Sequence, residues 1–428
     1  GFKAFRTPWA PRSHGSGPSL RIPAMNVPPS APAGRLRDLS PFAADTISRY
    51  PALFDDLSGS GRLARQSASG ELAGLLTAHL AGTSGDDDFL KRLRLFRHRE
   101  LVRIIWRDLN EGADVTESLR DLSDLADAAI NSALDYADGL LRARHGAPRA
   151  EDGTPCGPGV IAMGKLGGHE LNFSSDVDLV FVFSGAGETD GARTLSNEEY
   201  FRLLAQRVID LLSRNTADGF VYRVDVRLRP FVYRRYLDYG VFSSLREMKA
   251  LIEAEVAKKE FRGNLKLGPG GIREIEFIVQ ALQLVRGGTV APLRERQILK
   301  ALPALVQAGC LPERDATELT TAYRFLRLAE NRIQALYDRQ THDLPADPAD
   351  QERLALAMAF PDWATFLAAL QVQRDTVARH FRDIVFRGTN GAGGAGDGDD
   401  AGPAGDGPGA ADAELAGVWL EEAAPEVQ

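Results

Sequence analysis

Cysteine is almost absent from this sequence of 428 residues. Its two cysteines, Cys156 and Cys310, are too few for a disulfide framework or for a zinc site built from four thiolates. Such low cysteine usage is typical of proteins from reducing compartments. We therefore predict that the protein works in the cytoplasm.

Long hydrophobic runs and a strong excess of one charge are missing as well. No stretch approaches the ~18 apolar residues of a membrane span, and the N-terminus lacks the apolar core of a secretory signal. The net charge is −8, but residues 388–428 alone carry nine acids and no base, so the remainder sums to +1. Neither a membrane nor a nucleic acid is therefore an expected partner.

What is present predicts a folded protein, since 44% of the residues are apolar and 26% are charged. A proline-rich leader over 1–38 and a Gly/Ala/Asp-rich stretch over 388–428 are both expected to be disordered, the latter as a linker with a truncated continuation. Between them we expect a helical region over 39–146, a small αβ unit over 147–240 and a second helical domain over 241–387.

The clearest helix is predicted from Asp114 to Gly146, where apolar residues recur every three or four positions. Asp114 and Glu117 resemble a capping box at its start. The preceding helix is rich in basic residues, including Arg94, Arg97, Arg103 and Arg107. Its basic face could meet an anionic partner, but we favour a solvated surface. The same choice arises for Arg324, Arg327, Asn331 and Gln334, which share one helical face; a solvated surface is again favoured.

The αβ unit shows a different period. A short buried strand is predicted over Gly159–Met163, a second, apolar strand over Leu179–Phe183, and a third strand over Phe220–Leu228. Gly164–Gly168 reads as a loop whose glycines permit close approach to a ligand. Ser196–Ser213 has the period of a helix.

Three acidic residues stand out in this unit. Asp176 and Asp178 are two positions apart at the entry to a strand, so their carboxylates should project from the same face. Asp225 lies in the middle of the third strand. If the two strands are neighbours, the three carboxylates converge, as a two-metal phosphoryl or nucleotidyl transfer site requires. The alternatives are a solvated acid pair and an ordinary surface ion pair of Asp225 with Arg223 or Arg227.

Three motifs carry a family resemblance. They are Gly164–Leu179 (GKLGGHELNFSSDVDL), Asp218–Pro230 (DGFVYRVDVRLRP) and Lys266–Phe277 (KLGPGGIREIEF). They closely resemble the N-terminal half of the bifunctional glutamine synthetase adenylyltransferase/adenylyl-removing enzymes of bacteria. Asn172 to Ser175 looks like the first of the two catalytic halves, which in this family implies the deadenylylating one.

The resemblance implies an α+β fold, mainly helical, in which a DNA polymerase β-like nucleotidyltransferase domain with a small mixed sheet is flanked by helical regions. The implied reaction is phosphorolysis of adenylyl-tyrosine on glutamine synthetase, which releases ADP. The implied partners are glutamine synthetase, the PII signalling protein, ADP or ATP, and phosphate. The implied residues are Asp176, Asp178 and Asp225 as catalytic ligands of Mg²⁺ or Mn²⁺, and Gly167, Gly168 and Ser175 for nucleotide binding.

The chain departs from the family pattern in two ways. Relatives carry an additional segment after Phe231, which is missing here, and the chain stops before any second catalytic half. The alternative function is therefore a catalytically impaired regulatory or binding module that recognises glutamine synthetase or PII.

Overall fold

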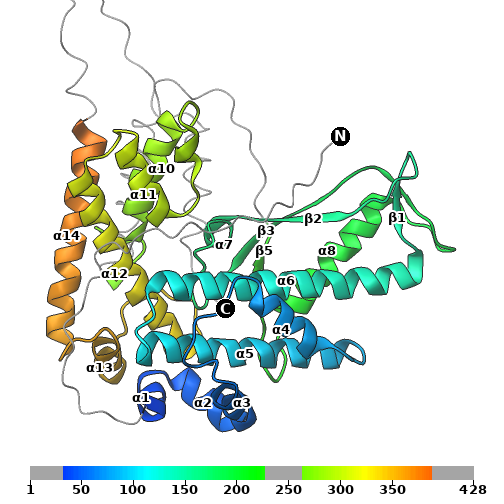
Figure 1. Ribbon diagram of the computed structural model, residues 1–428, viewed down its shortest axis with the longest axis horizontal. Helices are drawn as coiled ribbons and strands as arrows, with labels where there is room; N and C mark the ends of the chain where they lie inside the picture. The colour runs from blue at the N-terminus through cyan, green and yellow to red at the C-terminus, as the bar shows by residue number, and fades with distance from the viewer. Residues whose placement is uncertain (1–31, 227–262, 388–428) are drawn as a thin grey trace, which may run out of the picture.

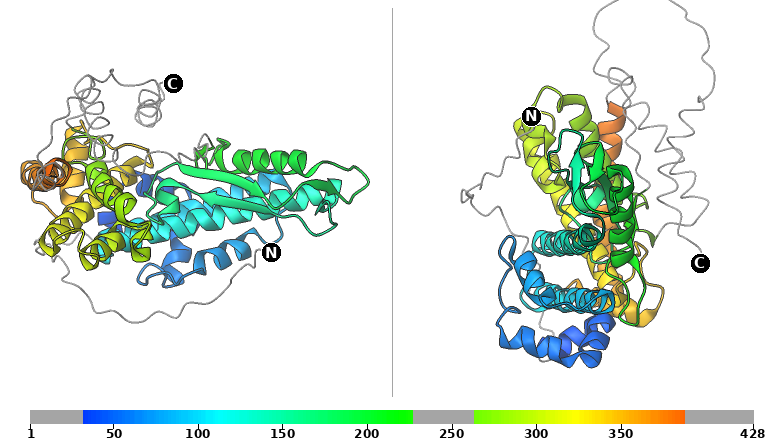
Figure 2. Two further views of the ribbon diagram at one scale, coloured as in Figure 1. Left: turned by 90° about the horizontal axis from the view of Figure 1, so that it is seen from above. Right: turned by 90° about the vertical axis from the view of Figure 1, so that its right-hand side faces the viewer.

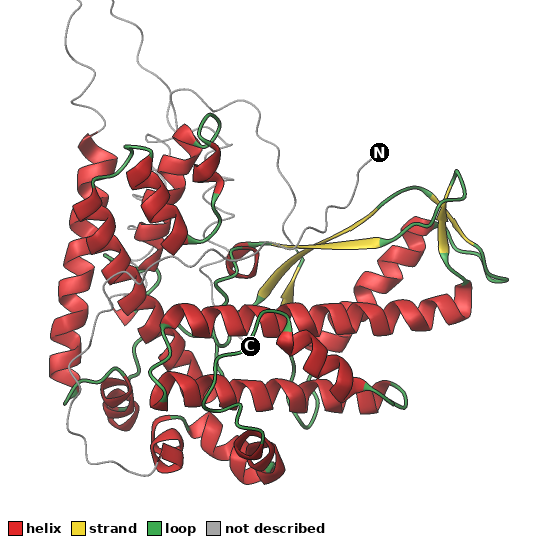
Figure 3. Ribbon diagram, in the orientation of Figure 1, coloured by secondary structure: helices red, strands yellow, loops and turns green. Residues whose placement is uncertain are grey.

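Helices dominate the structure, and a small strand-containing unit follows one helical block in the chain and precedes another (Figures 1 and 3). The computed structural model describes residues 32–226 and 263–387. The expectation of a mainly helical α+β fold is confirmed. The helices of the first block are α1 (Pro32–Leu39), α2 (Pro41–Arg49), α3 (Pro51–Gly59), α4 (Glu71–Leu80), α5 (Asp86–Asn110) and α6 (Val115–His145).

The αβ unit that follows contains two small sheets. Strands β1 and β4 pair antiparallel, and the second sheet has the order β2-β3-β5. This second sheet is mixed, because β3 is antiparallel to β2 and parallel to β5. The elements of the unit are β1 (Pro148–Ala150), β2 (Pro158–Ala162), α7 (Gly164–Gly167), β3 (Val177–Phe183), β4 (Gly187–Thr189), α8 (Asn197–Ser213) and β5 (Val224–Asp225).

The C-terminal block is helical throughout its described elements. They are α10 (Ile272–Arg286), the short 3₁₀ helix η2 (Ala291–Arg294), α11 (Ile298–Gln307), α12 (Glu313–Tyr337), α13 (Pro348–Ala357) and α14 (Trp363–Arg387). Among the residues that the structure describes, no helix is both long and apolar enough to cross a bilayer.

Two hydrophobic cores hold the elements together. One joins the N-terminal helices to the αβ unit, and the other fills the C-terminal block. Helix α12 contributes to both, since Ile333 belongs to the second core and Ala335 to the first. The C-terminal block stands at one end of α5 and α6, and the β2-β3-β5 sheet extends along α6 away from it (Figures 1 and 2).

Helix α6 confirms the predicted start at Asp114. The Asp114 side chain accepts a hydrogen bond of 2.9 Å from the backbone N–H of Thr116. The predicted capping box is wrong in its second half, because the Glu117 carboxylate binds Arg107 of α5. A cation within reach is a stronger partner for a carboxylate than a backbone N–H.

Most of the basic face of α5 is buried, so its interpretation as a solvated surface is wrong for four of its arginines, although Lys91 is exposed. The arginines Arg94, Arg97, Arg103 and Arg107 are all less than a tenth exposed. Their partners come from distant segments: Arg94 Nε donates to the Gly219 carbonyl at 2.7 Å, and Arg97 Nη1 lies 2.6 Å from Asp338 Oδ2. Arg94 and Arg97 of α5 therefore bind segments of the αβ unit and of the C-terminal block.

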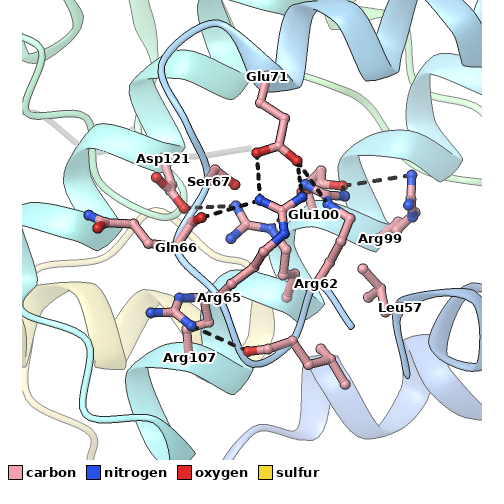
Figure 4. Close-up of polar contacts among 12 residues, drawn as sticks. Leu57, Arg62, Arg65, Gln66, Ser67, Glu71, Arg99, Glu100, Arg107 and Asp121 are labelled. Atoms are coloured by element: carbon pink, nitrogen blue, oxygen red, sulfur yellow. Dashed lines mark hydrogen bonds and ion pairs between the residues drawn. The ribbon is translucent and has the colours of Figure 1, made fainter. Parts of the chain in front are cut away.

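Glu100 lies at the centre of a buried polar network on the same helix (Figure 4). Its carboxylate accepts from both Arg62 Nη atoms, at 2.5 and 3.1 Å, and from Arg103 Nε at 2.7 Å. Arg103 also donates to Asp121 of α6 at 2.8 Å. Burial by itself raises the pKa of Glu100, but these arginines overcome that effect and hold the pKa below its usual value.

Glu71, at the edge of this network, makes stability sensitive to acid. Hydrogen bonds from Arg65 lower the pKa of Glu71 to about 2 from its usual 4.5. The stabilisation is therefore present above pH 4.5 and is lost as pH falls toward 2. We expect Glu71→Gln to lower the free energy of unfolding by roughly 1–3 kcal/mol at neutral pH. Urea titrations from pH 6 to 3 should show this difference from the wild type shrinking, and a difference that does not change with pH contradicts the assignment.

Several predicted elements need correction in the αβ unit. Strand β2 is not fully buried, since only one of its faces packs on the core and Ile161 on the other face is 49% exposed. Gly164–Gly168 is not an open loop. Its first four residues form a turn of helix, α7, which is closed by hydrogen bonds from Gly167 N to Met163 O and from Gly168 N to Gly164 O.

Two boundaries also differ from the sequence-based expectation. Helix α1 occupies the end of the predicted leader over 1–38, and its Leu36 is fully buried. The third strand, predicted over Phe220–Leu228, is limited to β5 within the described residues, because Val221 and Tyr222 donate to the Leu212 carbonyl instead of to a strand. The junction at Phe231 and the stretch 388–428 lie outside the described residues.

Candidate active site

The acidic pair lies at the start of β3, on one face of the sheet. Val177 and Leu179 are buried in the core at 0% and 1% exposure, whereas Asp176 and Asp178 are half-buried on the opposite side. Because side chains alternate along a strand, this pattern places both acids on the outer face. The alternating burial agrees with the predicted shared face, although β3 itself begins one residue after Asp176.

Asp225 lies directly beside Asp178. Strands β3 and β5 are parallel, and their register pairs Asp178 with Asp225 and Val177 with Val224. The hydrogen bond from Val177 N to Arg223 O, 3.0 Å long, starts this pairing. Residues paired in adjacent strands project from the same face, so the two carboxylate-bearing positions are neighbours. The condition that the sequence left open, that the two strands be adjacent, is met.

Asp176 has other partners. Its Oδ1 lies 2.5 Å from Arg223 Nε, and its Oδ2 accepts from Gln340 Nε2 at 2.9 Å. Arg223 also donates from Nη2 to the Ser174 carbonyl at 2.9 Å. The sequence allows Arg223 to pair with Asp225, but in the structure Arg223 pairs with Asp176. Gln340 reaches this site from the segment after α12.

The donor chemistry fits a divalent cation at the two aligned positions. Carboxylate oxygens are the ligands that Mg²⁺ and Mn²⁺ prefer, and Asp178 and Asp225 offer them from adjacent strands. Across 32–226 and 263–387, however, no group of three His, Cys, Asp or Glu side chains is arranged to hold a metal ion. The structure places two of the three predicted ligands, Asp178 and Asp225, side by side. The third, Asp176, binds Arg223 and Gln340.

The glycines of the α7 turn make room for the chain itself. Gly164 has a φ of +54°, and a Cβ at this position would overlap Asp178 Oδ2. A Cβ on Gly167 would overlap the Ala162 carbonyl, and one on Gly168 would lie 3.5 Å from the Arg296 carbonyl. Packing therefore accounts for Gly164 and Gly167, and the nucleotide-binding role of Gly167, Gly168 and the half-buried Ser175 stays a prediction.

Lys165 anchors the same turn to helix α12. Its Nζ lies 3.0 Å from Glu330 Oε1, and burial lowers the pKa of the ammonium to about 8 despite the attraction of that carboxylate. His342 Nδ1 lies 2.6 Å from the same oxygen. Although burial works to raise it, these neighbours hold the pKa of Glu330 well below its usual range. No sequence pattern marked this contact, because Lys165 and Glu330 are 165 positions apart.

The polar face of α12 is also buried, so its interpretation as solvated is wrong for three of its four members. Arg327, Asn331 and Gln334 are at most 2% exposed and contact the segment before the acids. The fourth, Arg324, is partly exposed and pairs with Asp114 at 2.5 Å. His169 binds Asp124 of α6 at 3.2 Å, and this contact raises the pKa of its imidazole.

The site thus combines adjacent carboxylates with cations. Asp178 and Asp225 lie side by side on β3 and β5, with the Arg223 guanidinium beside Asp176. Adjacent carboxylates attract a metal ion, and a guanidinium binds phosphoryl oxygens. This arrangement is suited to chemistry on a phosphate ester.

The sequence matches two known protein families. Residues 33–238 match the family model of glutamate-ammonia ligase adenylyltransferase, and residues 246–385 match that of GlnD PII-uridylyltransferase.

Three relatives carry the same name, bifunctional glutamine synthetase adenylyltransferase/adenylyl-removing enzyme. The relative from Thioalkalivibrio sulfidiphilus is 40% identical over 89% of this chain and 44% of its own length. Those from Nitrosococcus oceani and Stenotrophomonas maltophilia are each 41% identical, over 81% and 82% of this chain and 41% and 42% of their own lengths. The chain spans less than half the length of the curated relatives it matches.

Proposed function

Because the chain belongs over residues 33–238 to the glutamate-ammonia ligase adenylyltransferase family, we propose that it removes adenylyl groups from glutamine synthetase. The reaction is metal-dependent phosphorolysis of adenylyl-tyrosine, carried out by the N-terminal half of a bifunctional enzyme. The fold around the β2-β3-β5 sheet is, in this proposal, a DNA polymerase β-like nucleotidyltransferase domain. The proposal includes a cytoplasmic location, where free Cys156 and Cys310 stay reduced.

The alignment of Asp178 with Asp225 across adjacent strands is the observation that carries this proposal. A phosphate oxygen attacks the adenylyl phosphorus as the bond from phosphorus to the tyrosine oxygen breaks. The proton that the attacking phosphate gives up ends on that oxygen, so the products are ADP and the unmodified tyrosine side chain of glutamine synthetase. Mg²⁺ or Mn²⁺, when bound, neutralises charge on the phosphoryl oxygens. Asp178 and Asp225 would hold the ion, and Arg223 adds positive charge beside Asp176.

The partners follow from the reaction. Glutamine synthetase appears in the names of the relatives and is the proposed protein substrate. Phosphate is the proposed second substrate and ADP the proposed product. The PII protein remains a proposed regulator. A binding module without catalysis is the second candidate, since Asp176 is engaged by Arg223 and Gln340.

The proposed function is tested by incubating the chain with adenylylated glutamine synthetase, inorganic phosphate and Mg²⁺. We expect ADP to be released and synthetase activity to be restored. Omission of phosphate should abolish ADP formation, which separates phosphorolysis from hydrolysis to AMP. Binding to glutamine synthetase without any ADP would contradict the enzymatic function and support the binding module.

A further inference from the structure

The segment that leads into the acids is buried but has no regular structure. Leu171, Asn172, Phe173 and Ser174 lie between α7 and β3 and are at most 3% exposed. A buried backbone N–H without a partner is costly, and this segment has no helix or strand to supply one. Its hydrogen-bond partners must therefore come from side chains.

Helix α12 supplies two of these partners. Asn331 Oδ1 accepts from the backbone N–H of Phe173 at 3.0 Å, and Gln334 Oε1 accepts from that of Ser174, also at 3.0 Å. Both amide side chains are buried, at 2% and 0% exposure. Two successive peptide groups of the segment are thus bound by one helix.

The same helix continues these contacts toward the start of the segment. Arg327 donates to the Glu170 carbonyl and to Asn172 Oδ1, at 2.5 Å each. Arg327 and Gln334 are about 10 Å apart along the helix axis at 1.5 Å per residue. The segment follows the helix with its contacts in order: Glu170 and Asn172 contact Arg327, Phe173 contacts Asn331, and Ser174 contacts Gln334.

This contact is close to the acids. Ser174 is two residues before Asp176, and its carbonyl accepts from Arg223, which also binds Asp176. Just beyond the end of α12, Gln340 binds Asp176 directly. A displacement of the segment at Ser174 therefore shifts the start of β3, on which Asp176 and Asp178 depend for their position.

We propose that Asn331 and Gln334 are positioning residues of the active site, which set the place of Asp176 and Asp178 by binding the backbone of the segment before them. The C-terminal block is then a part of the site, although its helix contributes no ligand to the metal ion. The effect on metal binding rests on the proposed function, whereas the effect on the order of the segment 170–176 does not.

The test compares four variants of the full chain. Asn331→Leu and Gln334→Met remove one acceptor each and keep a side chain of similar length. Asn331→Asp keeps an acceptor oxygen at the same place, one helical turn from the Arg327 guanidinium. Asn197→Leu is the matched control, since Asn197 is an equally buried amide, 1% exposed, that binds the backbone at Arg149 and Gly185 instead.

Mn²⁺ affinity is measured by electron paramagnetic resonance, and hydrogen exchange is followed in the peptide that covers 170–176. We expect Asn331→Leu and Gln334→Met to raise the Mn²⁺ Kd by about tenfold or more, as the loss of groups that orient metal ligands generally does. Exchange over 170–176 should accelerate in the same variants. Asn331→Asp should stay within about threefold of the wild type, and Asn197→Leu should lower Tm without changing either readout.

The proposal is overturned if both variants keep the wild-type Kd and the wild-type exchange over 170–176, or if Asn197→Leu changes the two readouts as much as they do. A wild-type chain that binds no Mn²⁺ would count against the proposed metal-dependent reaction. Exchange then decides the present inference alone: acceleration supports it, and an unchanged rate overturns it.

Discussion

Asp178→Asn is expected to lower kcat for ADP release by about a thousandfold or more, which corresponds to about 4 kcal/mol of lost transition-state stabilisation. The substitution keeps the size of the side chain and removes its charge, at the position aligned with Asp225. An amide is a weak ligand for Mg²⁺ or Mn²⁺, so the ion and its charge are lost together. The assay is the release of ADP from adenylylated glutamine synthetase at saturating phosphate.

Asp190→Asn is the control for this experiment. Asp190 belongs to the same αβ unit and binds Arg149 at 2.9 Å beside the β1–β4 pair, where no part of the proposed site lies. Its variant should keep wild-type kcat. A chelator should abolish the wild-type reaction, and added Mn²⁺ should restore it. If Asp178→Asn retains full activity, Asp178 does not hold the metal and the proposed site is wrong.

Glu100→Gln is expected to lower the free energy of unfolding by about 3–5 kcal/mol. Glu100 is fully buried and is the shared anion of Arg62 and Arg103, which are themselves 5% and 0% exposed. Removing the charge leaves two guanidinium groups in a poorly solvating interior, with only part of their charge balanced by Asp121. Urea denaturation monitored by circular dichroism measures the change.

Glu199→Gln tests whether the effect comes from burial. Glu199 pairs with Arg202 at 2.7 Å, but both side chains are open to solvent, at 42% and 51% exposure. Solvent screens such a pair, so this variant should unfold close to the wild-type urea concentration. Similar midpoints for the Glu100 and Glu199 variants would show that the buried network contributes little.

Local patterns were sufficient for the elements whose environment is set by near neighbours. The period of α6 and its cap at Asp114 follow from residues within one or two helical turns. The expectation that Asp176 and Asp178 share a face follows from strand alternation, because the two residues are separated by one position, Val177. These features were predicted correctly because no distant segment can change them.

The burial of charge could not be predicted in the same way. Arg97 reads as a surface residue on a basic helix, yet its partner Asp338 is 241 positions away. Asn331 and Gln334 look like part of a solvated face, but they bind backbone groups about 160 positions earlier. A charged or amide side chain can form its hydrogen bonds with water or with a buried protein group. The sequence around it therefore does not reveal whether it is exposed or buried.

The sequence by itself determined the family, the mainly helical α+β class and the acids of the candidate site, because long motifs and residue periodicity are local properties of the chain. Only the tertiary structure decided that Asp178 and Asp225 are adjacent, that Asp176 is bound by Arg223 and Gln340, and that α12 holds the segment before them. These contacts join residues from 47 to 164 positions apart, and their energies depend on burial that no single segment has before the chain has folded.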